Sequence, residues 1–283
     1  MFFETVRKDA VWGSEFWTVA AHPHGDCVVL AGTYMGEKLS SLWKNHRELF
    51  GDFDGEEFPL LVKIIDARTD LSIQVHPDDA YAYKNENGSL GKTEAWYVME
   101  VPDDERLLLG HNARSREDAV KMIKEGRWKD LLKMVKIKKG EFILINPGTV
   151  HAICGGTKLL EIQENSDITY RLYDYDRKEN GKLRELHIDK SLDVMEIPDM
   201  SPEHHYSVFP QKGYETPFFK ISRFSVNKEG RFSFGKSFAI VSVIEGEGTI
   251  DGRIIKRGDS FIVPAGYGDA VFTGEVDVLL TNL

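Results

Sequence analysis

Short apolar runs rich in β-branched and aromatic residues recur along this chain. They are "CVVLAG" at 27–32, "LLVKIID" at 60–66, "LSIQVH" at 71–76, "EAWYVMEV" at 94–101, "EFILIN" at 141–146 and "KLLEIQ" at 158–163. Clusters of Gly, Pro, Asp and Asn separate them, which is the pattern of many short strands joined by turns. The hydrophobic pattern therefore predicts a mostly β protein.

Two segments have a helical period instead. In "SSLWKNHRELFG" at 40–51 apolar residues recur at helical spacing, and Gly51 can end the helix in a left-handed conformation. In the segment around 111–135, Ser115 and Asp118 resemble a capping box, and apolar residues up to Val135 follow a helical period broken near Gly126. We therefore expect a small helical insert around 111–135.

One turn motif occurs twice in the sequence. "INPGTVHAI" at 145–153 and "VPAGYGDAV" at 263–271 share a frame in which a glycine, Gly140 or Gly258, lies eleven residues before His151 or Asp269. Turns of this kind between short strands resemble those of the cupin jelly roll. The expected fold is therefore two cupin-type jelly-roll β-barrels with the helical insert in the first. The domains would be 1–197, a proline-punctuated linker at 198–217, and a second cupin at 218–283 that lacks metal because Asp269 replaces the usual histidine.

Four polar residues could form a metal site inside the first barrel. Gln74 and His76 are two apart on a predicted strand, so their side chains share a face. Glu94 begins another strand and His151 follows the "NPG" turn. Two imidazoles and a carboxylate suit Zn²⁺ or another divalent ion. By spacing alone, an equally good interpretation makes both histidines ordinary turn residues.

Cationic residues accompany this set in the sequence. Lys63 interrupts an apolar run, Lys92 lies two residues before Glu94, and Arg171 is in "SDITYRLYDYDR". Lysines on strands usually extend to solvent, and that is the simpler interpretation of Lys63 and Lys92. A metal beside Lys and Arg would instead suit an anionic, oxygen-rich ligand such as a sugar phosphate.

Composition and charge exclude several classes of protein. The 283 residues are 41% hydrophobic and 29% charged, which fits a globular chain with a large core. A net charge of −10 argues against nucleic-acid binding. We expect neither a signal peptide nor a membrane span, because no apolar run is long enough. Two cysteines, Cys27 and Cys154, are too few for a disulfide scaffold, so we expect a cytoplasmic protein.

Four motifs, in order, resemble the mannose-6-phosphate isomerases of the short bacterial class. They are "FPLLVKIIDARTDLSIQVHPDD", "GKTEAWYV", "NPGTVHAI" and "LEIQENSDITYRLYDYDR". The resemblance implies one divalent metal, usually zinc, with His76, Glu94 and His151 as ligands and Gln74 as an additional or substitute ligand. It also implies a catalytic role for Arg171, and active-site or phosphate contacts for Ser72, Lys63 and Lys92. Thr18 departs from the family pattern, which usually has a glutamate there.

The family reaction interconverts mannose 6-phosphate and fructose 6-phosphate through a cis-enediol. It needs a proton donor and acceptor, and Glu161, Lys92 and a metal-bound water are the candidates for the base. Two alternatives use the same residues: an Fe(II)-dependent cupin oxygenase, and a sugar-phosphate-binding protein without catalytic activity. We expect a monomer or a small homo-oligomer.

Overall fold

The computed structural model describes residues 1–51 and 53–283. These residues form two compact units. The central unit contains residues 9–15 and 65–208, and the terminal unit contains residues 1–8, 16–64 and 209–283. Three strands, β2 (Val6–Ala10), β3 (Gly13–Val19) and β7 (Leu60–Ala67), have residues in both units.

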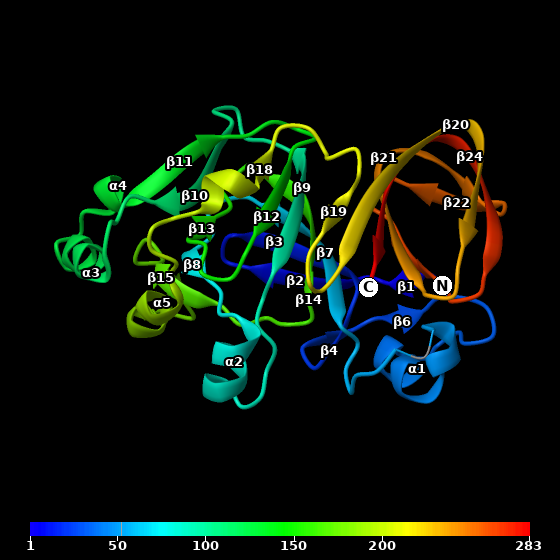
Figure 1. Ribbon diagram of the computed structural model, residues 1–283, viewed down its shortest axis with the longest axis horizontal. Helices are drawn as coiled ribbons and strands as arrows, with labels where there is room; N and C mark the ends of the chain where they lie inside the picture. The colour runs from blue at the N-terminus through cyan, green and yellow to red at the C-terminus, as the bar shows by residue number, and fades with distance from the viewer. Residues whose placement is uncertain (52) are drawn as a thin grey trace. The chain divides into compact units, whose positions relative to one another are not determined.

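The central unit is built on two antiparallel sheets (Figure 1). One has five strands in the order β11-β10-β13-β8-β15, and the other includes the order β18-β12-β9-β14. The strands are β8 (Ile73–Val75), β9 (Glu94–Glu100), β10 (Arg106–His111), β11 (Leu132–Lys136), β12 (Phe142–Ile145), β13 (His151–Ala152), β14 (Lys158–Glu164), β15 (Tyr170–Tyr173), β18 (His205–Tyr206) and the small hairpin β16 (Lys178–Glu179) and β17 (Lys182–Leu183). The helices are α2 (Asp79–Asn85), α3 (Arg116–Lys124), α4 (Trp128–Leu131), α5 (Ile188–Val194) and the 3-10 turn η2 (Ser201–His204).

The five-stranded sheet is buried on both faces, because successive side chains of each strand point to opposite sides. Leu107 and Leu109 on β10 belong to an inner core that also contains Trp96 of β9. Leu108, between them in sequence, belongs to an outer core with Ala119 of α3. Because successive side chains of a strand point to opposite faces, one sheet supplies both cores. Residues that share the inner face of this sheet therefore face the interior of the unit.

The helical insert is shorter than the sequence pattern predicts. The Ser115 hydroxyl accepts a hydrogen bond from the Asp118 amide at 3.2 Å, which confirms the predicted N-cap, and Gly126 breaks the helix with a φ of +65°. The prediction that the helix continues through Val135 is wrong. Val135 lies on β11 opposite Leu107 of β10, because pairing at the edge of the sheet satisfies the backbone there.

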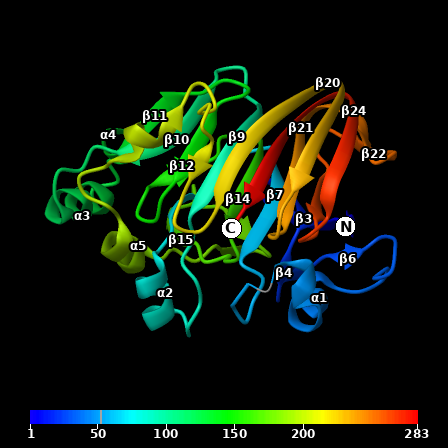
Figure 2. The same ribbon diagram turned by 45° about the vertical axis from the view of Figure 1, so that its right-hand side comes forward.

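The terminal unit carries a sheet in the order β19-β20-β24-β21-β22, with β23 also paired to β21 (Figure 2). Its long strands β20 and β24 pair along their whole lengths, from Lys220 opposite Asn282 to Phe234 opposite Gly268. The elements are β1 (Phe3–Glu4), β4 (Ala21–His22), β5 (Gly25–Asp26), β6 (Val28–Val29), α1 (Leu39–Asn45), η1 (Arg47–Leu49), β19 (Tyr214–Glu215), β20 (Lys220–Phe234), β21 (Ala239–Ile250), β22 (Arg253–Lys256), β23 (Ser260–Val263) and β24 (Gly268–Asn282).

The first predicted helix is present in this unit as α1 followed by η1, and Gly51 has the expected positive φ of 86°. Its aromatic face is buried: Trp43 packs edge-on against Phe50 and Phe58 at ring distances of 5.1 and 5.3 Å. The predicted strand at 27–32 is reduced to β6, Val28–Val29, because a tight turn with backbone hydrogen bonds around Gly32 and Gly36 follows it.

The repeated turn is present in both units. The four glycines of its frame all have positive φ, a conformation that glycine adopts without steric cost, with values of 89° at Gly140, 85° at Gly148, 97° at Gly258 and 69° at Gly266. Asp269, at the position of the histidine, is exposed and accepts a hydrogen bond from the Ser233 hydroxyl. Within residues 1–51 and 53–283, Asp269 belongs to no group of ligand-type side chains close enough to share a metal ion.

The segment at 198–217, expected to be a linker, contains η2, β18 and β19. The domain boundaries at 197 and 218 remain predictions. No helix in the described residues is long and apolar enough to cross a lipid bilayer.

Candidate metal centre and active site

Three neighbouring strands place three of the predicted site residues in a row. Arg171 on β15 is opposite Gln74 on β8, and Gln74 is opposite His151 on β13. Residues directly opposite one another across antiparallel strands share a face of the sheet. The row lies on the inner face, because Ile73 and Val75, which flank Gln74, belong to the outer core.

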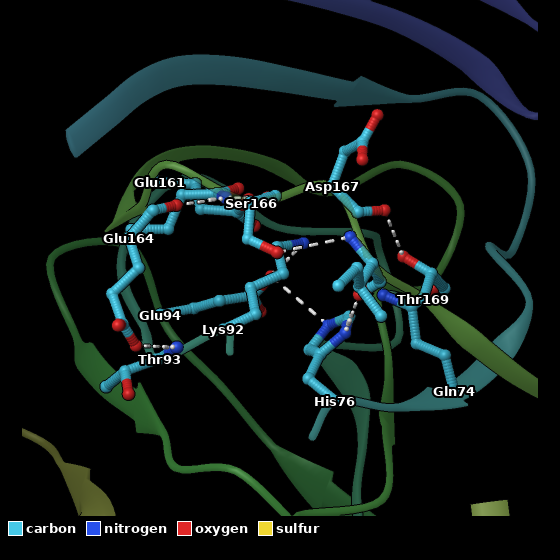
Figure 3. A network of polar contacts seen from close by, with 12 residues as sticks. Gln74, His76, Lys92, Thr93, Glu94, Glu161, Glu164, Ser166, Asp167 and Thr169 are labelled. Atoms are coloured by element: carbon cyan, nitrogen blue, oxygen red, sulfur yellow. Dashed lines mark hydrogen bonds and ion pairs between the residues drawn. The ribbon is translucent and has the colours of Figure 1, made fainter. Parts of the chain in front are cut away.

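The ligand-type atoms of His76, Glu94 and His151 all lie within 4.8 Å of one another. Glu94 Oε1 is 3.3 Å from His76 Nε2, and Glu94 Oε2 is 3.7 Å from His151 Nε2. The three side chains are at most 1% exposed. Figure 3 shows His76 and Glu94 directed toward the same region from different elements. Folding thus brings together three residues that are 18 and 57 positions apart in sequence.

Backbone carbonyls determine which nitrogen of each imidazole carries the proton. His76 Nδ1 lies 2.8 Å from the Ile168 carbonyl oxygen, and His151 Nδ1 lies 2.9 Å from that of Thr149. A carbonyl can only accept, so each Nδ1 is the protonated donor and each Nε2, the nitrogen on the Glu94 side of the ring, keeps a lone pair. A partner on the far ring nitrogen is the usual arrangement for metal-binding histidines.

The charge state of the set also suits a cation. Burial lowers the pKa of His151 to about 3 and also lowers that of His76, so both imidazoles are neutral at pH 7. Burial opposes ionisation of Glu94, but the Lys92 ammonium, 2.5 Å from its Oε1, holds the pKa of that carboxyl well below its usual value. Two lone pairs and a carboxylate therefore face one another.

The residues fit a divalent metal. In the described part of the chain, His76 Nε2 and both Glu94 oxygens are buried without a hydrogen bond of good geometry, although Lys92 contacts Oε1 as an ion pair. Buried acceptors are rarely left unsatisfied, and a cation shared by these atoms would satisfy all of them. Nitrogen and oxygen donors of this kind suit Zn²⁺.

Two further predicted residues lie beside this set. Gln74 Nε2 is 3.2 Å from His151 Nε2, and the side-chain oxygen Oε1 of Gln74 accepts a hydrogen bond from the Ser72 hydroxyl at 3.3 Å. Ser72 is 4% exposed, so its contact with Gln74 is inside the protein. In this structure Ser72 therefore orients the amide of Gln74.

Arg171 completes the row with a guanidinium that is available for a ligand. Its Nε is buried and, within the described residues, makes no hydrogen bond. Burial, followed by the charge of Arg184, lowers the pKa of Arg171 and outweighs the opposite effect of nearby carboxylates such as Asp174. The arrangement can thus present a cation, a metal site and an amide on one inner face.

The sequence and the fold both match proteins of one family. Residues 6–98 match the model of the phosphomannose isomerase type I catalytic domain, and residues 211–282 match that of the mannose-6-phosphate isomerase cupin domain. The chain is 42% identical to the mannose-6-phosphate isomerase ManA of Bacillus subtilis, with 100% of this chain and 98% of that protein covered. The chain belongs to the mannose-6-phosphate isomerase family.

Other members of the family agree with this assignment. A mannose-6-phosphate isomerase of Streptococcus mutans is 39% identical over 95% of this chain and 88% of its own length. The crystal structure of the Bacillus subtilis mannose 6-phosphate isomerase matches with a TM-score of 0.92 at 37% identity, covering 100% and 99% of the two chains. The chain is therefore a cupin isomerase, and the comparisons support neither the oxygenase alternative nor that of a sugar-phosphate-binding protein without catalytic activity.

Two predicted site residues lie further from the ligand set. Glu161 on β14 is buried, and its carboxylate accepts from the Trp96 indole N–H at 2.8 Å. Trp96 in turn packs edge-on against His151 at a ring distance of 5.3 Å, so the indole connects Glu161 to the ligand set. Lys63 is buried on β7 among residues of the terminal unit. Thr18 donates a hydrogen bond from its hydroxyl to the Val62 backbone carbonyl at 3.1 Å.

Several residues that shape this isomerase site gave no signal in the sequence. Trp96 is part of an apolar strand and was not distinguishable from other core residues. Ile168 and Thr149 act through backbone carbonyls, which every residue possesses. Glu164 is buried beside the segment that carries Lys92, and only its position in the fold reveals this.

Proposed function

We propose that this isomerase binds a single Zn²⁺ ion through His76, Glu94 and His151, with Gln74 as an additional ligand. The observation that carries this proposal is the set of buried acceptor atoms within 4.8 Å of one another, two of them on neutral imidazoles. When bound there, the ion would act as a Lewis acid toward substrate oxygens.

The proposed reaction is the interconversion of mannose 6-phosphate and fructose 6-phosphate. Two cations, Arg171 and Lys92, flank the candidate metal site in a chain of net charge −10, which favours an anionic substrate at this place. The relatives carry the same activity in their names. Ser72 and Lys63 are proposed contacts of the substrate and its phosphate, Ser72 acting through its hydroxyl beside Gln74.

Isomerisation moves a proton between C2 and C1 of the open-chain sugar through a cis-enediol. Loss of the C2 proton from the aldose leaves negative charge on the C1 oxygen, and the Arg171 guanidinium would stabilise that charge electrostatically. Lys92 carries a proton on Nζ beside Glu94 and is the proposed donor to a substrate oxygen. Glu161 is the proposed proton acceptor from carbon, held in place by its hydrogen bond from Trp96.

We further propose that residues 1–197 form the catalytic domain and residues 218–283 a cupin without metal. A cytoplasmic location fits the two buried free cysteines, Cys27 and Cys154. The proposed assembly is a monomer or a small homo-oligomer.

A coupled assay under anaerobic conditions tests the reaction. The protein loaded with zinc should convert mannose 6-phosphate to fructose 6-phosphate, and removal of the metal by a chelator should abolish conversion until zinc is restored. Arg171→Ala should lower kcat about a hundredfold or more, whereas Arg177→Ala should not. Arg177 is a matched control because its guanidinium is paired with Asp174 at 2.6 Å. An inactive wild type with zinc bound would refute the isomerase proposal, and full activity without metal would remove the ion from the mechanism.

A further inference from the structure

The segment that carries Lys92 is held by hydrogen bonds at three successive backbone amides. The Gly91 N–H donates to Asp79 Oδ1 at 2.7 Å, the Lys92 N–H to the Pro77 carbonyl at 3.0 Å, and the Thr93 N–H to Glu164 Oε2 at 2.8 Å. Two of the three acceptors are therefore carboxyl side chains. Asp79 and Glu164 are not among the predicted site residues, and the proposed isomerase reaction does not use either of them.

The two carboxyl groups come from different elements of the central unit. Asp79 is the first residue of α2 and follows His76 by three positions, whereas Glu164 is the last residue of β14. Figure 3 shows the Glu164 carboxyl beside Thr93, with Lys92 and Glu94 next along the chain. Gly91 has no room for a side chain, because a Cβ there would lie 2.5 Å from Asp78 and Asp79 backbone atoms.

Glu164 is 3% exposed, and burial, with a smaller contribution from the neighbouring Asp79 carboxylate, raises the pKa of Glu164 to about 7. A neutral carboxylic acid still accepts the hydrogen bond from the Thr93 amide through its carbonyl oxygen, so the contact does not require an ionised Glu164.

We propose that Glu164 and Asp79 are a pair of carboxyl groups that positions Lys92 for proton transfer in the isomerase reaction. The pair acts through the backbone of residues 91–93, so both members are positioning residues. Lys92 needs such support because its Nζ must stay beside Glu94 and still reach the substrate, and small displacements of a catalytic group cost much of its effect. The inference rests on the proposed catalytic role of Lys92.

Steady-state kinetics of zinc-loaded variants provide the first test. Glu164→Ala removes the acceptor of Thr93 and should lower kcat about ten- to hundredfold, with KM for mannose 6-phosphate changed by less than about threefold. Glu164→Gln should restore kcat to within about threefold of wild type, because the side-chain amide oxygen still accepts the hydrogen bond from the Thr93 amide. Glu141→Ala is the matched control: Glu141 is also a buried carboxylate, paired with His205 at 2.7 Å, and its loss should leave kcat unchanged.

Hydrogen exchange at the amides of residues 91–93 provides a readout that does not depend on activity. Exchange should accelerate in Glu164→Ala and, if that variant does not fold, in Asp79→Ala, and it should remain slow in Glu164→Gln and Glu141→Ala. Unchanged exchange and unchanged kcat in Glu164→Ala would overturn the proposal, and so would a Glu164→Gln variant as impaired as Glu164→Ala. If wild-type enzyme with zinc does not isomerise, the proposed function fails instead, and the exchange experiment alone decides whether the pair holds the segment.

Discussion

The buried Glu164 carboxyl should make the stability of this protein fall as the pH rises. Its pKa is about 7 in the folded state, against an ordinary value of 4.5, mainly because burial disfavours its charged form. Between these values the folded state binds more protons than the unfolded state, so the free energy of unfolding decreases with pH. The contribution of protonated Glu164 to the free energy of unfolding is fully present below the pKa of Glu164 in the unfolded state. It is lost as the pH rises through the pKa of Glu164 in the folded state.

The size of this effect on the free energy of unfolding follows from the difference between the two pKa values of Glu164. A difference of about 2.5 pKa units corresponds to about 3 kcal/mol at about 1.4 kcal/mol per unit. About 2.5 kcal/mol of this is lost between pH values of about 5 and about 8. Because Glu164 is only 3% exposed, no large reduction for solvent screening applies.

Glu164→Gln removes this titration and keeps the shape of the side chain. The free energy of unfolding of metal-free wild type and variant is measured by urea unfolding, followed by tryptophan fluorescence, at pH values of about 5 and about 8. The contributions of the other titrating groups cancel in the difference between the two proteins. Relative to wild type, the free energy of unfolding of the variant should be about 2.5 kcal/mol more favourable to the folded state at the higher pH than at the lower pH. Asp79→Asn should weaken the pH dependence without abolishing it, because burial is the larger cause of the shift. The same pH dependence in wild type and Glu164→Gln would refute the reasoning, since Glu164 would then ionise at an ordinary pKa.

Two other perturbations test the ion pair and the terminal unit. Lys92→Met leaves the Glu94 carboxylate buried without its cation, so metal-free variant should lose about 3–5 kcal/mol of unfolding free energy. Zinc should then stabilise the variant more than the wild type in thermal unfolding, and equal gains would mean that lysine and metal do not share Glu94. Trp43→Ala should cost about 3–5 kcal/mol, because Trp43 is 2% exposed in an aromatic core. Its zinc content per chain should stay at the wild-type value, and a parallel loss of zinc would contradict the separate placement of the ligands in the central unit.

Regular elements were predicted well where the local pattern was unambiguous. Strands β7, β9, β12 and β14 begin and end within two residues of the apolar runs that predicted them, and α1 with η1 matches the helical spacing that ends at Gly51. Leu132–Lys136 was wrongly assigned to a helix, because its apolar spacing is compatible with a helix and with an edge strand. The choice depends on pairing with β10, a partner more than twenty residues away.

The candidate ligands were found by motif, but their arrangement was not predictable. The sheet order places β8 between β13 and β15, so Gln74 lies between His151 and Arg171 although all three are far apart in sequence. Strand order of this kind depends on long-range pairing, which local propensity does not determine.

The chemistry that this protein has available follows from its residue types and short motifs. The sequence supplied two imidazoles, a carboxylate and an amide for a metal, cations for an anionic substrate, and a twice-used turn that kept its histidine only at His151. These properties belong to residue types and to short motifs, so they can be read without coordinates.

The protonation and orientation of those groups follow from the packing of distant parts of the chain. Burial makes both imidazoles neutral, and the carbonyls of Ile168 and Thr149 put their protons on Nδ1 and leave a lone pair on each Nε2. Burial beside Asp79 likewise raises the pKa of Glu164. Protonation and orientation depend on solvent exclusion and on which backbone groups lie nearby, and both arise only when distant parts of the chain pack together.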